Sequence, residues 1–316
     1  MAIRNNQNND NNLGFGNRFG TRRQKILSED GTFNIQRIGQ NIFEKHSLFQ
    51  YLITIRWIKF FVIVTIGFII ANSFFAFLYA FIGPECLGFS SDLSFIQTFI
   101  ESFFFSAQTL STVGYGRVAP ISFSANLLAA IEAMLGLLGF ALATGIMYGR
   151  FSRPKARLLK SKNVLIVPYK EGHALMFRIA NKYNSQLMET EAELILAMMV
   201  GEGDKKIRRF FNLSLEFKRI VFFSLSWTIV HPIDEKSPLY QLKANDLEEA
   251  DAELMVLFKG FDETFSQHTY ARFSYHHNEF IWGAKFKPMS GPDDSKFAAT
   301  IDLSKISDYE SITLNG

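Results

Sequence analysis

Thr109-Leu110-Ser111-Thr112-Val113-Gly114-Tyr115-Gly116 is the most informative stretch of the sequence. This octet lies between two long apolar segments. A backbone can surround a dehydrated cation with oxygen atoms only if successive carbonyl groups point the same way. Such an alternating backbone needs positive φ angles, which glycine adopts readily and most other residues resist. The glycines at 114 and 116 stand where this freedom is needed.

Four copies of this loop around an axis would stack rings of carbonyl oxygens that replace the hydration shell of K⁺. The Thr112 hydroxyl would add a further ring below them. The octet therefore predicts a selectivity filter with K⁺ as the permeant ion, and a tight glycine turn is the alternative. The filter is assigned to Thr112, Val113, Gly114, Tyr115 and Gly116.

The two apolar segments are each long enough to cross the ~30 Å hydrocarbon layer as a helix. Residues 60–82 carry no charge, and residues 127–147 are interrupted only by Glu132. We expect the first spanning helix over about 57–82 and the second over about 126–149. A charged side chain inside a span must face protein or water rather than lipid, so Glu132 is expected to point inward.

A short reentrant helix is expected before the filter, over about 99–109. Thr98 with Glu101 fits a capping box at its start, and Ser94 with Gln97 is a competing start. The C-terminal carbonyls of this helix would point toward the pore centre, where the helix dipole favours a cation.

Basic residues gather beside one end of each expected span, whereas the connecting loop carries only Arg117 against three acids. This asymmetry predicts a multi-pass protein of the cell membrane with both termini in the cytoplasm. Residues 42–55 are amphipathic and suit a helix in the membrane interface, the alternative being an ordinary helix of a soluble domain. The expected division is a disordered tail over 1–25, a cytoplasmic segment with the interfacial helix over 26–55, a pore domain over 56–152 and a cytoplasmic domain over 153–316.

The second half of the chain changes in texture, with short apolar runs separated by turn residues. Such spacing favours strands, and a sandwich of them over a helical bundle. The runs are residues 164–167, 174–179, 192–200 and 254–258.

Several functional classes are excluded by what the sequence lacks. The net charge is only +3 and no nucleic-acid motif is present, so we expect no nucleic-acid partner. Cys86 is the only cysteine, which rules out an intrachain disulfide, and it is expected to be packed or free in the outer loop. His268, His276 and His277 have no cysteine or acid at a ligand spacing, so no metal beyond K⁺ is expected. No nucleophile with a base, no phosphate loop and no paired catalytic carboxylates are found, so we expect neither an enzyme nor a cofactor.

The whole pattern resembles the inwardly rectifying potassium channels, most closely their prokaryotic branch. The resemblance rests on motifs in the pore and in the second half: residues 26–31, 34–35 and 37, 103–108 into the filter, 148–154, 223–234, 237–240 and 279–283. It implies two transmembrane helices with a reentrant pore helix and filter, plus a cytoplasmic all-β immunoglobulin-like sandwich. It also implies a homotetramer and suggests a bacterial inner membrane.

The resemblance assigns further residues to the ion pathway. Gly136, Phe140, Thr144 and Tyr148 recur at four-residue spacing on one helical face, which it places on the conduction path as a gate. Packing against lipid or neighbouring helices is the alternative for that face, and Gly136 could serve bending or close packing. Residues 260–266, with Phe261 and Phe265, resemble a loop that forms a second constriction, or else make an ordinary strand connection.

Two acidic positions of strongly rectifying relatives are changed in this chain. Phe140 stands where those relatives carry an acid, and Lys259 replaces another in the cytoplasmic pathway, although Glu202 is kept. Strong voltage-dependent block is therefore not expected. The resemblance places Glu132 and Gln108 behind the filter as its support.

A cationic set beside the spans is expected to meet the inner leaflet and to bind anionic lipid, each charge contributing about 1 kcal/mol. Setting the topology is the alternative role for the same charges. The set is Arg56, Trp57, Arg150, Arg153, Lys155 and Arg157, and residues matching most of it contact lipid phosphates in eukaryotic relatives.

Two other functional classes are alternatives to a channel of this family. One is a membrane-tethered sensor whose pore is vestigial, against which the intact filter speaks. The other is a different two-span potassium channel gated by a soluble ligand, for which the sequence offers no nucleotide or calcium site.

Overall fold

The computed structural model describes residues 25–28, 31–35, 47–152, 158–182, 186–201, 206–291 and 300–313. The chain divides into two compact units, one of Ile38–Arg153 and one that combines Met1–Arg37 with Pro154–Gly316. Almost all of the tail predicted to be disordered lies outside the described residues.

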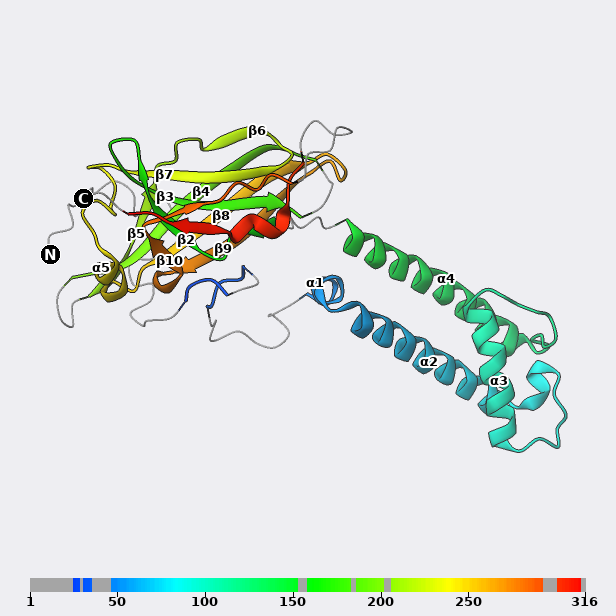
Figure 1. Cartoon of the computed structure of the whole chain (residues 1–316). Helices are drawn as coiled ribbons and strands as arrows, with labels where there is room; N and C mark the ends of the chain where they lie inside the picture. Colours follow the sequence, from blue (N-terminus) through cyan, green and yellow to red (C-terminus); the bar gives the residue numbers. More distant parts are fainter. Residues whose placement is uncertain are drawn as a thin grey trace. The chain divides into compact units, whose positions relative to one another are not determined.

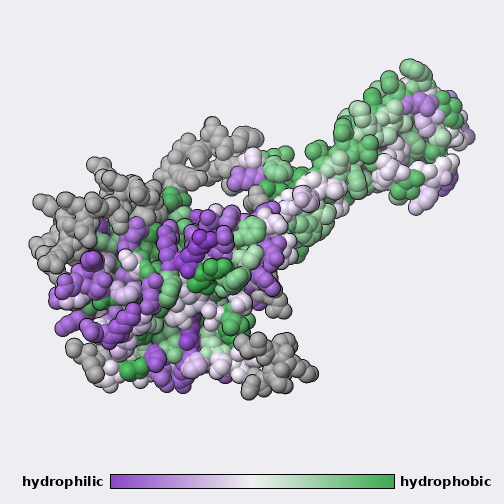
Figure 2. Space-filling view, turned by 90° about the horizontal axis from the view of Figure 1, so that it is seen from above, coloured by the Kyte–Doolittle hydropathy of each residue, from purple (hydrophilic) through white to green (hydrophobic). Residues whose placement is uncertain are grey.

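The first unit is helical (Figure 1). Its elements are α1 (Leu48–Thr54), α2 (Trp57–Ile82), the 3-10 helix η2 (Pro84–Leu87), α3 (Phe95–Leu110) and α4 (Phe123–Phe151). Both α2 and α4 are long and apolar enough to cross a membrane. Most of their side chains are not buried within the chain, and Figure 2 shows apolar residues over the visible face of this unit.

Helix α3 begins four residues before the predicted start, so the choice of Thr98 as cap was wrong. Ser94 Oγ accepts from the Gln97 backbone N–H at 3.4 Å, and Gln97 Oε1 accepts from the Ser94 N–H at 3.0 Å. This reciprocal capping box satisfies two free donors of the first turn. Thr98 instead lies inside that turn, where its hydroxyl donates to the Ser94 carbonyl.

The other helices differ less from expectation. Helix α4 begins at Phe123 because Ser122 Oγ accepts from the Ala125 N–H at 3.1 Å, which adds a turn before the predicted 126. The described part of the amphipathic stretch forms α1, and Ser47 caps it. Residues 42–46 of that stretch lie outside the described residues.

The second unit is a β-sandwich. Its strands are β1 (Leu158–Lys160), β2 (Val164–Tyr169), β3 (Gly172–Asn181), β4 (Leu187–Val200), β5 (Ile207–Leu213), β6 (Arg219–Phe223), β7 (Ser226–Ile233), β8 (Glu253–Asp262), β9 (Gln267–His276), β10 (Phe280–Trp282), β11 (Ala284–Phe286) and β12 (Tyr309–Ser311). Three short helical segments accompany them: α5 (Ala244–Glu249), η4 (His277–Glu279) and η5 (Leu303–Ser307).

Two five-stranded sheets make the layers of this sandwich (Figure 1). One runs β1-β3-β2-β10 with β7 added on β3, and the other runs β5-β4-β8-β9 with β6 added on β4. The pairings are antiparallel except for β10 with β2, and β11 pairs with β12 as a separate ribbon. All four predicted apolar runs lie in strands, in β2, β3, β4 and β8, so the predicted sandwich is confirmed.

The core of the sandwich lies between the two sheets. Its largest fully buried side chains include Phe177, Phe223, Phe258 and Tyr275. Burying an aromatic side chain of this size removes more apolar area from water than any aliphatic residue can. These rings therefore give the strands a rigid frame for the segments that pack outside them.

One such segment comes from the N-terminal side of the membrane helices. The backbone N–H groups of Ile26 and Leu27 donate to the Glu253 carboxylate at 2.7 and 3.2 Å. Both side chains are buried in a cluster with Phe210 and Met255. A segment that precedes α2 is thus part of the unit that follows α4.

Candidate ion pathway

The filter segment begins directly at the C-terminus of α3. The N–H groups of Val113 and Gly114 both donate to the Gln108 carbonyl, at 2.9 and 3.3 Å. This tether fixes where the filter leaves the helix. The contact that the structure gives Gln108 with the filter is therefore made by its backbone.

Positive φ angles alternate along the filter. Thr112 has φ of +61°, Gly114 +53° and Gly116 +79°, whereas Val113 and Tyr115 between them do not lie in this region. Alternation of this kind turns successive carbonyls toward one side of the chain. A β-branched residue with positive φ is an outlier that costs free energy, and such outliers gather at functional sites. The conformation that the glycines predicted is present, and Thr112 shares it.

Glu132 of α4 is fully buried, and its partners lie on α2 and α3. Tyr79 of α2 donates to Glu132 Oε2 at 2.8 Å, and Ser106 of α3 contacts Glu132 Oε1. Ser106 Oγ also lies 2.9 Å from Asn72 Oδ1, and Asn72 Nδ2 donates to the Phe68 carbonyl at 2.7 Å. The expectation that Glu132 faces protein is confirmed. Its hydrogen bonds join α2, α3 and α4, and they reach α3 at Ser106, about one turn before the end of that helix.

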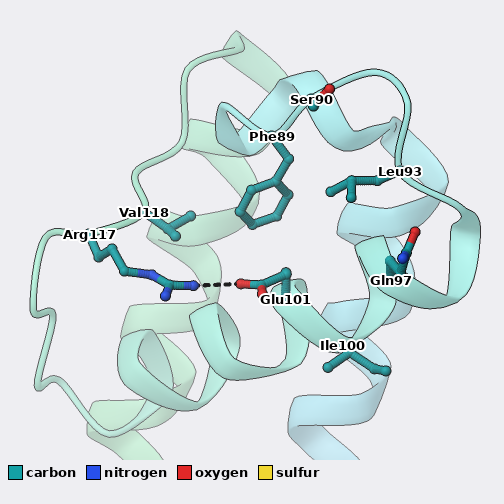
Figure 3. Close-up of a pocket in the computed structure, with 8 residues that line it drawn as sticks. All are labelled: Phe89, Ser90, Leu93, Gln97, Ile100, Glu101, Arg117 and Val118. Carbon is teal, nitrogen blue, oxygen red and sulfur yellow. Dashed lines mark hydrogen bonds and ion pairs between the residues drawn. The ribbon is translucent and has the colours of Figure 1, made fainter.

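The return strand after the filter is held at its outer side. Arg117, the residue after the filter, pairs with Glu101 of α3 at 2.6 Å across a cavity of about 490 Å³ (Figure 3). The Ile121 N–H donates to the Cys86 carbonyl at 2.8 Å. Cys86 is buried and free, and burial raises the pKa of its thiol. The segment after Gly116 is therefore joined both to α3 and to the loop that contains Cys86.

The four residues of the predicted gate face of α4 differ in their solvent exposure. Phe140 and Tyr148 are each 74% exposed on the isolated chain, and Thr144 is exposed as well. Gly136 is buried instead, since a Cβ atom there would lie 2.2 Å from the Leu110 carbonyl oxygen. The assignment of Gly136 to the lining of the pathway is corrected on this point: it allows close packing of α4 on α3.

Arg150, in the last turn of α4, has partners within the protein. Its guanidinium donates to the Leu52 and Ile55 carbonyls at 2.5 and 2.7 Å. It also lies over the rings of Trp57 at 4.4 Å and Phe60 at 4.9 Å. These contacts satisfy carbonyls at the end of α1 and join the α1–α2 corner to α4. The sequence predicted a lipid contact, or a role in setting the topology, and not these contacts with protein.

Of the remaining members of the predicted lipid set, two lie among the described residues. Arg56 and Trp57 are exposed at the start of α2. Arg153, Lys155 and Arg157 lie outside the described residues, as does Glu202 of the predicted cytoplasmic pathway.

The predicted second constriction is the connection of a β-hairpin. Strands β8 and β9 pair along their whole length, from Glu253 opposite His276 to Asp262 opposite Gln267. Phe261 lies opposite His268, one position before the end of this pairing, and Phe265 in the turn is 48% exposed. Lys259 lies opposite Glu191 of β4. The alternative of a strand connection describes the local structure.

The sequence missed residues that act through distant partners. Asn72 and Tyr79 belong to no motif, and Ser106 was noted only as part of the stretch 103–108, yet all three belong to the hydrogen-bonded cluster around Glu132. Asp251 lies within hydrogen-bond distance of His276, although 25 positions separate them in the chain. The spacing of the histidines in the sequence gave no sign of this acid, because sequence spacing does not show the register between β8 and β9.

Comparison with known proteins agrees with this architecture. Residues 158–315 match the model of the inward rectifier potassium channel C-terminal domain, and residues 62–153 match a model described as ion channel. The inward rectifier potassium channel Kirbac3.1 of Paramagnetospirillum magnetotacticum is 36% identical over 84% of this chain and 89% of its own.

More distant relatives come from vertebrates. ATP-sensitive inward rectifier potassium channel 12 of Bos taurus and of Homo sapiens are each 28% identical over 87% of this chain and 70% of theirs. Among solved structures, the sporulation control protein Spo0M of Bacillus subtilis matches 40% of this chain and 49% of its own. With 9% identity and a TM-score of 0.19, that match carries no argument. The two family-model matches and the 36% identity over 84% of the chain show that this chain belongs to the inward rectifier potassium channel family.

Proposed function

We propose that four copies of this chain form a channel that conducts K⁺ passively through the segment from Thr112 to Gly116. The observation that carries the proposal is the alternation of positive φ angles at Thr112, Gly114 and Gly116. Backbone carbonyls that face one side can form a ring only when several subunits surround an axis. The high exposure of the Tyr115 and Val113 side chains on the isolated chain, 81% and 52%, agrees with packing against further subunits.

The proposed gate lies on the lower half of α4. Phe140 and Tyr148 are large, apolar and uncovered within one chain, so rings of them around an axis would narrow the path and exclude water. Thr144 lies between them on the same face. In this proposal the β8–β9 turn with Phe265 forms a second narrow point in the cytoplasmic pathway.

Contacts within the second unit support the proposed topology. Ile26 precedes α2 and Glu253 follows α4, and they share a hydrogen bond of 2.7 Å. This contact supports the proposal that both ends of the chain lie on the same side of the membrane. The basic residues beside the spans favour the cytoplasm as that side.

The proposed contact with anionic lipid is made by Arg56 and Trp57 rather than by Arg150. Arg56 is exposed beside the exposed Trp57 at the start of α2, where an amphipathic ring favours the headgroup region. Arg150 holds the α1–α2 corner, so a lipid bound at Arg56 would act on α4 through that corner. This coupling links the proposed lipid site to the proposed gate.

Uptake of ⁸⁶Rb⁺ by proteoliposomes tests the conduction proposal. We expect uptake that exceeds ²²Na⁺ uptake and that external Ba²⁺ inhibits. Gly114→Ala should abolish it, since an alanine at φ of +53° is strained by about 1–2 kcal/mol. Gly67→Ala is the matched control, because a Cβ atom there meets nothing within 4 Å.

Two outcomes would contradict the proposal. Equal permeation by Na⁺ and Rb⁺ would refute the filter as the selective element. Unchanged uptake in Gly114→Ala would favour a role in which the pore is vestigial. Native mass spectrometry of the purified protein tests the stoichiometry, and a monomer would refute the ring of carbonyls.

A further inference from the structure

A cluster of two imidazoles and one carboxylate lies at the end of the β8–β9 hairpin that is remote from its turn. His276 ends β9, His277 begins η4, and Asp251 lies two residues before β8. The register that sets Glu253 opposite His276 brings Asp251 to both histidines. One ligand atom from each of these three side chains lies within 4.8 Å of the others.

The spacing of these atoms suits a small tetrahedral ion. His276 Nε2 lies 3.1 Å from Asp251 Oδ1, and the two imidazole rings are 4.1 Å apart between centroids. Two ligands bound to Zn²⁺ at ~2.0–2.2 Å in tetrahedral geometry are about 3.4 Å apart. Small side-chain rotations are therefore enough to bring all three atoms onto one ion.

The surroundings of Asp251 favour a cation. Arg208 donates to Oδ2 of Asp251, which leaves Oδ1 turned toward His276. Carboxylates that bind metals are commonly oriented by such a second hydrogen bond. Arg208 also lies 3.8 Å from Glu253, so one guanidinium serves two carboxylates and the local charge stays negative.

The carboxylate and the imidazole of the cluster differ in their exposure to solvent. The Asp251 side chain is 6% exposed, whereas that of His276 is 23% exposed. An ion could reach the imidazoles from solvent and gain the carboxylate on the buried side. Burial of the carboxylate also strengthens its attraction for the ion, because the local dielectric is lower than that of water.

We propose that Asp251, His276 and His277 form a binding site for a divalent transition-metal ion of the Zn²⁺ class, with water as the fourth ligand. Imidazole nitrogens suit Zn²⁺, Cu²⁺ and Ni²⁺, whereas Mg²⁺ and Ca²⁺ prefer oxygen ligands throughout. The bound ion would pin the segment before β8 to the corner after β9. Glu253 next to this site holds the N-terminal segment through Ile26.

Equilibrium dialysis of the full-length, tag-free channel in lipid nanodiscs against ⁶⁵Zn²⁺ tests the proposal. We expect stoichiometric binding per chain, and Co²⁺ substitution should give the visible absorption of a tetrahedral site. His277→Ala and His276→Gln should each weaken the affinity at least tenfold. His268→Ala is the matched control, since His268 is an exposed histidine at the opposite end of β9 and should leave the affinity unchanged.

Asp251→Asn separates a metal site from a hydrogen bond between His276 and the carboxylate. Asparagine keeps an acceptor for Arg208 but removes the charged ligand and the counter-charge of a buried guanidinium, so the melting temperature without metal should fall, and the Zn²⁺ affinity should fall even when it is measured well below that temperature. Absence of stoichiometric Zn²⁺ binding to the wild-type channel would overturn the proposal. Equal affinity in wild type and His277→Ala would do the same, and so would loss of binding in His268→Ala alone.

Discussion

Replacing Glu132 by glutamine should leave the pore unit nearly as stable as the wild type, whereas alanine should not. The reason lies in the hydrogens of the buried cluster. Asn72 Nδ2 donates to the Phe68 carbonyl, which fixes Asn72 Oδ1 toward Ser106 as an acceptor. Ser106 has a single hydroxyl hydrogen but lies between that acceptor and Glu132 Oε1. Every group is satisfied if Glu132 carries a proton, donates to Ser106 and accepts from Tyr79.

Glutamine reproduces this pattern, because its amide donates to Ser106 and its carbonyl accepts from Tyr79. We expect a loss within about 1 kcal/mol. Alanine leaves the Tyr79 hydroxyl without an acceptor, at about 1–3 kcal/mol, and opens a cavity that adds about 1–2 kcal/mol. The two variants should therefore differ by about 2–4 kcal/mol.

Cys86 supplies the assay. It is the only cysteine of the chain and its thiol donates to the Tyr79 carbonyl at 3.7 Å, in the same apolar cluster. Because burial raises the pKa of this thiol, little reactive thiolate is present in the folded protein. A fluorogenic maleimide added during a thermal ramp should report the unfolding of the pore unit.

Two serines on α3 provide the matched control. Ser102 and Ser106 are both fully buried, but within the described part of the chain Ser102 Oγ has no hydrogen-bond partner. Ser106→Ala should lower the melting temperature, and Ser102→Ala should leave it unchanged or raise it. A glutamine variant at position 132 that melts as early as the alanine variant would refute the hydrogen count, because the cluster would then need the charge of a carboxylate.

Three further predictions follow from single contacts. Gly136→Ala places a Cβ atom 2.2 Å from the Leu110 carbonyl oxygen and should destabilise the pore unit by about 1–3 kcal/mol in the same thermal assay, whereas Gly139→Ala meets nothing within 4 Å and should be neutral or stabilising. Arg150→Lys keeps the charge but cannot span two carbonyls or stack on aromatic rings, so stability should fall by about 1–2 kcal/mol and the dependence of flux on anionic lipid should weaken with it; a weaker lipid dependence without any loss of stability would show a headgroup contact instead. Burial lowers the pKa of His231 below its unfolded value, so the unfolded chain binds more protons as the pH falls through about 6.5; the sandwich should lose stability there in urea titrations, and His231→Gln should flatten the pH profile, with an unaltered slope counting against this account.

The features that the sequence predicted well are those whose signals are local. Two glycines at alternate positions indicated the filter backbone, and uncharged stretches long enough to cross a bilayer located both helices. Short apolar runs located four strands of the sandwich. The start of α3 was mistaken because two capping boxes follow each other directly in the sequence, and the box of Ser94 with Gln97 is the one that forms.

Features that depend on pairing between distant segments were not visible. Tyr79 is 53 positions from Glu132, and nothing in its own neighbourhood marks it as a partner. Arg150 was recognised as a cation, but its contact with the Leu52 carbonyl spans 98 positions. A charge near a span end is consistent with lipid, with topology and with packing, and only the tertiary structure distinguishes these roles.

The bond between Ile26 and Glu253 has a consequence for how the protein is made. These residues are 227 positions apart, and the whole pore unit is inserted between them. A ribosome that synthesises the chain from the N-terminus releases Ile26 long before its acceptor exists. The sandwich can therefore complete its fold only after both long helices have been synthesised, so the last contacts of the second unit form after the whole pore unit has left the ribosome.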